Sequence, residues 1–325
     1  MGARSPLLSP TVLLAIAGVI VGLAILTYSA DQFVIGAARV AISMRLSKVV
    51  VGAVVIGFGT STPEMLVSAL AGVQGSLDLA VGNIVGSNIA NLSLVLGAAA
   101  LVTPITVEVD VLRREALLSF GLVAVFAFVL RQSMHVRDGV VLAVLFLAAL
   151  TFIIIDARRG DDSLGAEVDE YLADGAVNPR TEWTRTILGL IGTLGAAQIL
   201  VTSASEVASQ LGMAEGFIGL TVVAVGTSLP ELAASLQAAR KDETDLIVGN
   251  LLGSNLFNAG AVGAIAAITG SGQQVSNTIS TAGVFVMLGG AAGATLFMAT
   301  GRRVTRTEGA VLLAAYVATV PLMAG

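Results

Sequence analysis

Cysteine is absent from this sequence of 325 residues, and histidine occurs once, at His135. The lack of cysteine excludes disulfide bonds, thiolate metal sites and cysteine nucleophiles, and a single histidine leaves almost no basis for a histidine metal site or catalytic cluster. Charged residues are scarce too, at 12% of the chain, with a net charge of −5. A soluble domain of this size needs more charge to cover its surface, and nothing in the charge balance suggests a nucleic-acid partner.

Hydrophobic residues take the place of the missing charge, at 55% of the chain with a mean hydropathy of +0.91. They form continuous runs of roughly 17–25 residues, the length that crosses a bilayer as a helix. Because the runs do not alternate between apolar and polar residues, they predict helices rather than strands. The 37 glycines fit this interpretation, since small residues let helices pack closely in lipid. The predicted fold class is therefore an all-α integral membrane protein.

The apolar runs predict ten transmembrane helices in two sets of five. The first set lies at residues 10–30, 47–73, 78–102, 112–131 and 137–156, and the second at residues 184–205, 214–239, 244–269, 277–299 and 305–324. The chain then divides into a first repeat (1–156), a short acidic linker (157–183) and a second repeat (184–325).

The distribution of basic residues predicts the orientation of these spans. Of the 17 lysines and arginines, 14 lie in the loops that follow odd-numbered spans, with Arg39 counted in the first of these loops. Cytoplasmic loops carry an excess of Lys and Arg. We therefore expect the central linker in the cytoplasm and both termini outside. With five spans each, the two repeats run in opposite directions through the membrane, as in many secondary transporters.

Two motifs occur at the same place in both repeats. The first is Gly59-Thr60-Ser61-Thr62-Pro63-Glu64, which corresponds to Gly226-Thr227-Ser228-Leu229-Pro230-Glu231, 167 positions later. The second begins at Gly82-Asn83 and corresponds to Gly249-Asn250, again 167 positions later. A weaker similarity, between Ser29-Ala30-Asp31 and Ala204-Ser205-Glu206, predicts that Asp31 and Glu206 are equivalent interface or funnel residues.

The first motif predicts a helix break in the middle of the membrane. Proline cannot donate a backbone hydrogen bond and clashes with the carbonyl four residues earlier. The break frees carbonyl groups near 57–60 and 224–227, and places Glu64 and Glu231 beside it. A buried charge at that depth needs a partner or a wet cavity. Carboxylates, carbonyls and hydroxyls together form an all-oxygen environment that suits Ca²⁺ and Na⁺.

The second motif adds polar side chains to one helical face. Asn83, Ser87 and Asn91 are four residues apart in the first repeat, and Asn250, Ser254 and Asn258 repeat this spacing. The Gly-x-x-x-Gly pairs at Gly82/Gly86 and Gly249/Gly253 are expected to bring these helices close to the broken ones. Two glutamates in duplicated surroundings are hard to explain as a structural pair alone.

At these motifs the sequence resembles the calcium/cation antiporter superfamily, and most of all its prokaryotic sodium/calcium exchangers. The two regions that carry the resemblance, 51–97 and 218–263, correspond to the alpha-repeats of that family. The resemblance implies that Glu64 and Glu231 coordinate Ca²⁺ and share the Na⁺ sites. It also implies further ligands from hydroxyls, carboxamides and backbone oxygens: Thr60, Thr227, Ser61, Ser228, Ser87, Ser254, Asn91, Asn258, Gly57 and Ala224.

Two departures from family patterns bear on the coupling ion. Some family members, including potassium-dependent ones, carry Asp where this chain has Asn258, so the resemblance implies a potassium-independent exchanger. Proton-coupled relatives typically carry Glu where this chain has Gly86 and Gly253. The expected activity is thus Na⁺/Ca²⁺ antiport by alternating access, electrogenic if more than two Na⁺ exchange for one Ca²⁺.

Other activities stay open at this stage. A Ca²⁺/H⁺ exchanger would use the same two glutamates as proton carriers, and a channel or an intramembrane carboxylate hydrolase would use them differently. We expect no enzymatic activity, no bound cofactor beyond the transported ions, no nucleic-acid partner, a monomeric functional unit and a place in the plasma membrane.

Overall fold

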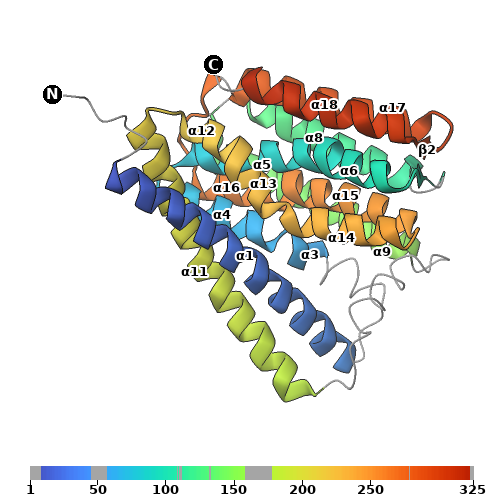
Figure 1. Cartoon of the computed structure of the whole chain (residues 1–325), viewed down its shortest axis with the longest axis horizontal. Coiled ribbons are helices and arrows are strands. Elements are labelled where there is room, and N and C mark those ends of the chain that lie inside the picture. The colour runs from blue at the N-terminus through green and yellow to red at the C-terminus, as the bar shows by residue number, and fades with distance from the viewer. Residues whose placement is uncertain are drawn as a thin grey trace.

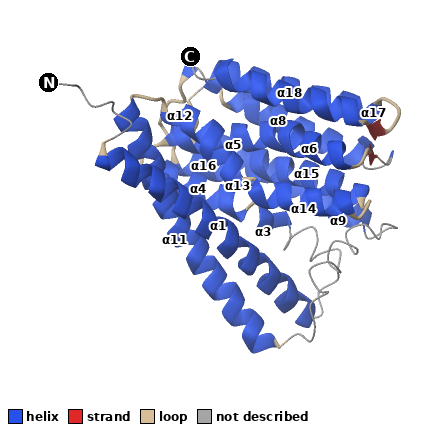
Figure 2. Ribbon diagram, viewed as in Figure 1, coloured by secondary structure: helices blue, strands red, loops and turns tan. Residues whose placement is uncertain are grey.

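The computed structural model describes residues 9–44, 57–107, 109, 112–131, 133–157, 178–277 and 279–322. It is almost entirely helical, apart from one short pair of strands (Figure 2). Six helical stretches are long and apolar enough to cross a membrane, and a bent helix pair makes a seventh, among these residues. The described part of each of the ten predicted spans is helical except near its ends and breaks. The prediction of an all-α membrane protein is confirmed.

The elements of the two repeats correspond one to one over most of their length. The first repeat contains α1 (Pro10–Ser43), α3 (Gly57–Thr60), α4 (Thr62–Val73), α5 (Leu77–Ala90), the π-helical turn η3 (Asn91–Val95), α6 (Leu96–Val102), β1 (Ile105–Thr106), the π-helical turn η4 (Leu112–Ala116), α8 (Leu117–Val129) and α9 (Val136–Ala157). The second contains α11 (Pro179–Leu211), α12 (Glu215–Ile218), the π-helical turn η5 (Gly219–Val223), α13 (Ala224–Thr227), α14 (Leu229–Arg240), α15 (Thr244–Phe257), the π-helical turn η6 (Asn258–Val262), α16 (Gly263–Thr269), the π-helical turn η7 (Ile279–Gly283), α17 (Val284–Ala299), β2 (Arg303–Val304) and α18 (Arg306–Leu322).

The 167-residue offset of the motifs holds for the elements around them. α3 and α13, α4 and α14, α5 and α15, η3 and η6, and α6 and α16 begin and end 167 positions apart, and so do η4 and η7. The strands β1 and β2 pair antiparallel and join the two repeats. The duplication predicted from two short motifs therefore covers most of the bundle.

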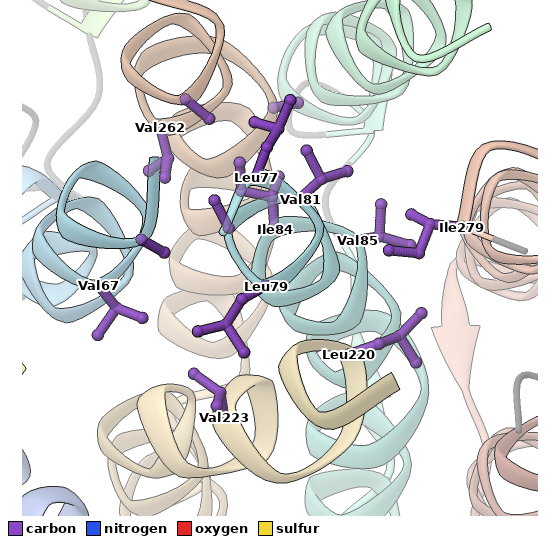
Figure 3. Packing of buried hydrophobic residues seen from close by; sticks show 14 of the residues in the cluster. Val67, Leu77, Leu79, Val81, Ile84, Val85, Leu220, Val223, Val262 and Ile279 are labelled. Atoms are coloured by element: carbon purple, nitrogen blue, oxygen red, sulfur yellow. The ribbon is translucent and has the colours of Figure 1, made fainter. Parts of the chain in front are cut away.

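The helices form a bundle with a slanted pair across one face. α1 and α11 lie side by side and leave the bundle towards the C-terminal end of α1, whereas α17 and α18 lie on the opposite face (Figure 1). α5 is in the middle, and its Leu77, Val81, Ile84 and Val85 pack among residues of the neighbouring helices (Figure 3). Every residue from Leu79 to Val95 on this stretch is buried apart from Leu94, so α5 and η3 are covered on all sides.

Local signals explain where the slanted helices begin and end. Ser9 caps α1 by accepting a hydrogen bond from the Val12 amide at 3.2 Å, and Pro10 occupies the first turn. Asn178 and Pro179 do the same for α11, which ends at Gly212 with a positive φ of 64°. Both helices are longer than predicted, at 34 and 33 residues. About 50 Å of helix exceeds a hydrocarbon core of about 30 Å, so each helix either tilts in the membrane or extends beyond the hydrocarbon core.

The register between α1 and α11 corrects one prediction from the sequence. Gly22 packs against the backbone of Leu200, and Gly189 packs against the backbone of Phe33. These two contacts are mirror images at the 167-residue offset, because Gly22 corresponds to Gly189 and Phe33 to Leu200. Asp31 therefore corresponds to Gln198, and the expected equivalence of Asp31 with Glu206 is wrong.

Arg39 also differs from its prediction, because it lies in α1 and is buried rather than in a loop. Its Nη1 atom is 3.3 Å from Oε1 of Glu182 on α11, and the exposed fractions of the two side chains are 8% and 5%. Arg185 reaches the other oxygen of Glu182, also at 3.3 Å. This cluster fastens the ends of α1 and α11 that lie farthest from the bundle.

Replacing Glu182 with Leu leaves both arginines without this carboxylate, and we expect the free energy of unfolding to fall by about 3 kcal/mol because the buried guanidinium of Arg39 loses this ion pair. The measurement is chemical unfolding in detergent. Glu206→Leu is the matched control on the same helix, where the glutamate accepts an exposed hydrogen bond from Gln210, and it should cost less than about 0.5 kcal/mol. Equal losses in the two variants would contradict a stabilising role for the cluster.

Candidate functional site

The two predicted helix breaks are present, one in each repeat. Ser61 separates α3 from α4, and Ser228 separates α13 from α14. Both serines have nearly the same backbone angles, with φ near −85° and ψ near 5°. The helices on either side of Ser228 are bent by 43°. A proline follows each serine by two residues and removes the amide that would continue the helix ladder.

Glu64 and Glu231 lie in the first turns of α4 and α14, directly after the breaks. A helix N-terminus carries a partial positive charge that favours a carboxylate there. Both side chains are buried, with exposed fractions of 0% and 1%. No positively charged group of the described residues forms an ion pair with either of them. The negative charge of the two carboxylates is therefore not balanced by a positively charged side chain among the described residues.

The two glutamates belong to one site. The carboxylate of Glu64 lies within electrostatic range of Glu231 and beside the hydroxyls of Thr227 and Ser228, which belong to the other repeat. Oε1 of Glu231 accepts a hydrogen bond from Ser254 at 3.3 Å. Several buried oxygens have no hydrogen-bond partner among the described residues: both carboxylate oxygens of Glu64, Oε2 of Glu231 and the hydroxyls of Ser61 and Ser228.

The polar face of α5 reaches across to the second repeat. The hydroxyl of Ser87 lies 3.4 Å from that of Thr227. Thr227 in turn donates to Oδ1 of Asn83 at 3.1 Å. Asn83 donates to the hydroxyl of Ser68 at 3.2 Å and to the backbone carbonyl of Glu64 at 3.4 Å. This side of the site is a closed network of neutral groups.

Asn91 and Asn258 lie at the start of the π-helical turns η3 and η6. Such turns widen a helix locally and occur often at functional sites. The amide of Asn91 donates to Oδ1 of Asn255 at 3.0 Å, but its own Oδ1 has no partner among the described residues. Neither polar atom of the buried Asn258 side chain has one there. Both carboxamides thus keep an oxygen for a ligand.

The backbone carbonyls at the breaks differ in their hydrogen-bond partners. The carbonyl of Ala224 accepts from the amide of Ser228 at 3.0 Å and lies 3.2 Å from the hydroxyl of Thr227, whose single proton can point to it or to Asn83. Proline at 63 and 230 instead removes the usual partner of the carbonyls four residues earlier, at Gly59 and Gly226. Gly57 is the first residue of α3, and Thr60 is its last.

The first of the two Gly-x-x-x-Gly pairs packs as expected. A methyl group on Gly82 or Gly86 would overlap carbonyl oxygens of Gly216 and Leu220, so α5 lies directly against α12 and η5. The residues that the repeat would place against Gly249 and Gly253, 48–56, lie outside the described part of the chain. Close approach is confirmed for α5 and stays a prediction for α15.

A cavity of about 870 Å³ lies beside the N-terminal half of α15. It is bounded by α1 on one side and by α14 and α15 on the other, and it reaches the breaks at Gly59, Thr60 and Pro230. Asp31, Ser235 and Asn250 also line it. We call the end of the bundle where α14 meets α15 the α14–α15 side, and the mirror end, where α4 meets α5, the α4–α5 side. The site is thus reached from the α14–α15 side.

Sequence reasoning missed two asparagines that join the repeats. Asn255 donates to the carbonyl of Asn88 at 3.2 Å and accepts from Asn91, which holds α5 and α15 together at the site. Asn88 donates to the carbonyl of Ile84 at 2.8 Å. The signal was present, because Asn88 and Asn255 are duplicated in the second motif, but the spacing of four residues drew attention to the other face.

The donor set consists of oxygen atoms. Two carboxylates, hydroxyls, carboxamides and backbone carbonyls suit hard cations such as Ca²⁺ and Na⁺. Among the described residues there is no group of three or more His, Cys, Asp or Glu side chains that would suit a metal held by charged ligands alone. A cation here would be balanced by two carboxylates and completed by neutral oxygens.

Comparison with known proteins identifies the family. The chain matches the profile of the sodium/calcium exchanger protein family over residues 14–155 and 182–324. The protein belongs to the sodium/calcium exchanger family. It is 38% identical to the putative antiporter CaxA of Alkalimonas amylolytica over 92% of this chain and 95% of that protein. It is 29% identical to the sodium/calcium exchanger MaX1 of Methanosarcina acetivorans, with the same coverage.

Solved structures agree with this assignment. The sodium–calcium exchanger NCX_Mj, soaked with 2.5 mM Na⁺ and 10 mM Sr²⁺, is 31% identical with a TM-score of 0.64, and the match covers 95% of this chain and 99% of that one. This family consists of transporters rather than enzymes. The protein is therefore a multi-pass membrane antiporter with the exchanger fold, which moves Ca²⁺ against another cation.

Proposed function

We propose that the protein exchanges Na⁺ for Ca²⁺, and that both ions compete for the oxygens around Glu64 and Glu231. The observation that carries this proposal is the pair of buried carboxylates from opposite repeats, with unpartnered oxygens between them. Two negative charges balance one Ca²⁺ or two Na⁺. Thr60, Ser61, Ser87, Asn91 and their counterparts in the second repeat would supply neutral ligands.

Alternating access follows from the inequality of the two sides. The α4–α5 side is closed by packing of α5 on α12, and the α14–α15 side holds the cavity. We place the protein in the plasma membrane. The distribution of basic residues then orients the α14–α15 side towards the cytoplasm and both termini towards the outside. In the opposite state the inequality is reversed. We infer that α1 and α11, which pack on each other through Gly22 and Gly189, move as one body.

Transport should not depend on K⁺, since the site has Asn258 rather than a third acid. Exchange of more than two Na⁺ for one Ca²⁺ is electrogenic, and the membrane potential then contributes about 2.3 kcal/mol per charge per 100 mV. We propose a monomer as the functional unit, with the ions and the lipid as its partners, without a bound cofactor or nucleic acid.

A proton-coupled exchanger is the second candidate, because two buried carboxylates without a positively charged partner among the described residues can also be neutralised by protons. Proteoliposomes separate the two. We expect an outward Na⁺ gradient in K⁺-free medium at uniform pH to drive ⁴⁵Ca uptake, and a valinomycin-imposed potential on addition of K⁺ to change its rate. Uptake driven by a pH gradient without Na⁺, and none by the Na⁺ gradient, would contradict Na⁺ coupling.

A further inference from the structure

The closed α4–α5 side is joined by a hydrogen bond between two glutamines. Nε2 of Gln74, just after α4, donates to Oε1 of Gln198 on α11 at 3.1 Å. α11 packs extensively along α4 at this side. The bond therefore joins the slanted helix pair to the rest of the bundle where no cavity opens.

The mirror positions of these two glutamines carry opposite charges. At the 167-residue offset Gln74 corresponds to Lys241, just after α14, and Gln198 corresponds to Asp31 on α1. The mirrored contacts of Gly22 and Gly189 show that the offset holds within the slanted pair, and the equal bounds of α4 and α14 show that it holds within the bundle. A neutral pair on one side thus has an acid and a base as its counterpart.

In this structure the mirrored contact is not made. Asp31 is exposed, lines the cavity and accepts a hydrogen bond from Gln32 at 3.2 Å. No ion pair joins it to Lys241, although both lie within the described part of the chain. α1 makes far fewer contacts with α14 than α11 makes with α4. Asp31 therefore faces the cavity and is not paired with Lys241, which has another interaction in this structure.

The interior of the site has the same inequality. On the closed side Asn83 bonds to Ser68 and accepts from Thr227. Their mirror residues are Asn250, Ser235 and Thr60, and all three line the cavity. The hydroxyl of Ser235 is buried without a partner among the described residues, whereas that of Ser68 is bonded. The hydroxyl of Ser235 thus lacks the kind of partner that Ser68 has among the described residues, and Ser235 lines the cavity as Asp31 does.

We propose that Asp31 and Lys241 are positioning residues that pair when α1 closes against α14, and so fasten the α14–α15 side while the site opens on the other. The pair forms as Gln74 and Gln198 separate. This inference rests on the proposed alternating-access function, but it does not depend on which ion is coupled. One side of the protein is thus closed by a charged pair, Asp31 and Lys241, and the other by an uncharged pair, Gln74 and Gln198. We call each of these pairs a latch.

Cross-linking tests the latch directly, because the chain has no cysteine of its own. The double variant Asp31→Cys/Lys241→Cys is treated in membranes with a short bifunctional methanethiosulfonate reagent, since contacting long side chains hold their Cα atoms too far apart for a direct disulfide. Gln74→Cys/Gln198→Cys is the matched control. Thiols left free are counted with a maleimide, and ⁴⁵Ca uptake is measured on the same samples.

Both pairs should cross-link, and each cross-link should stop uptake until it is reduced. Ionic conditions that raise the yield of one pair should lower that of the other. The latch is wrong if Asp31→Cys/Lys241→Cys stays free in Na⁺, in Ca²⁺ and in neither, while the control pair cross-links. Cross-linking of both pairs in a protein whose uptake needs a pH gradient keeps the latch and rejects Na⁺ coupling.

Charge exchange separates a latch from a residue that only attracts cations. Asp31→Lys should lower the maximal uptake rate by about two- to fivefold, the range expected for an exposed ion pair, and adding Lys241→Asp should restore it. If Asp31→Lys raises only the KM for Ca²⁺ and the second substitution restores nothing, Asp31 recruits cations and the pairing is wrong.

Discussion

Glu64→Gln and Glu231→Gln should each lower Na⁺-gradient-driven ⁴⁵Ca uptake by at least about 100-fold. Each substitution removes one of two buried charges that balance the cation, and the loss of one partner from a buried charge pair costs about 3 kcal/mol or more. Glutamine has nearly the same shape, so the neutral contacts around the site should persist. Uptake is measured in proteoliposomes with equal amounts of folded protein.

The comparison of the two variants is as informative as the loss itself. A single site made by both repeats predicts equal defects, because Glu64 lies within electrostatic range of Glu231 and beside Thr227 and Ser228 of the second repeat. Glu206→Gln, a glutamate of α11 outside the site, should keep full uptake. Retained uptake in both site variants would remove the two carboxylates from the mechanism, and half-activity in each would indicate two independent sites.

Gly86→Val should lower the free energy of unfolding by about 3 kcal/mol, whereas Gly121→Val should cost less than about 1 kcal/mol. Gly121 is an exposed glycine of α8. A side chain on Gly86 would overlap the carbonyl of Leu220 and the methyl of Ala224, while no described residue has an atom within 4 Å of the position it would take on Gly121. The measurement is unfolding in detergent, followed by any suitable spectroscopic signal. Equal destabilisation by the two substitutions would contradict the close packing of α5 against η5 and α13.

Much of this architecture is predictable from residues that repeat. The two motifs gave the offset of 167 positions, and proline after a Gly-Thr-Ser sequence is enough to place the breaks at Ser61 and Ser228. Glu64 and Glu231 were predictable as site residues because a carboxylate in an apolar segment is costly unless it has a partner or faces a wet cavity. These features are local, and local patterns are what a sequence displays.

The features that escaped prediction depend on contacts between distant segments. Arg39 was predicted in a loop because its ion-pair partner, Glu182, is 143 positions away in the sequence and could not be foreseen. The cavity on the α14–α15 side could not be foreseen, because two matching sequences do not say which of two mirrored states is populated. Asn255 and Asn88 meet across the repeats for the same reason.

Equilibrium binding of ⁴⁵Ca to the purified protein, titrated with Na⁺, tests the central claim most directly. A single site formed by both repeats predicts that each chain binds one Ca²⁺, that Na⁺ displaces it completely by competition, and that K⁺ has no effect. It also predicts that both Glu64→Gln and Glu231→Gln abolish binding. Two Ca²⁺ per chain, or Ca²⁺ binding that Na⁺ leaves unchanged, would contradict it.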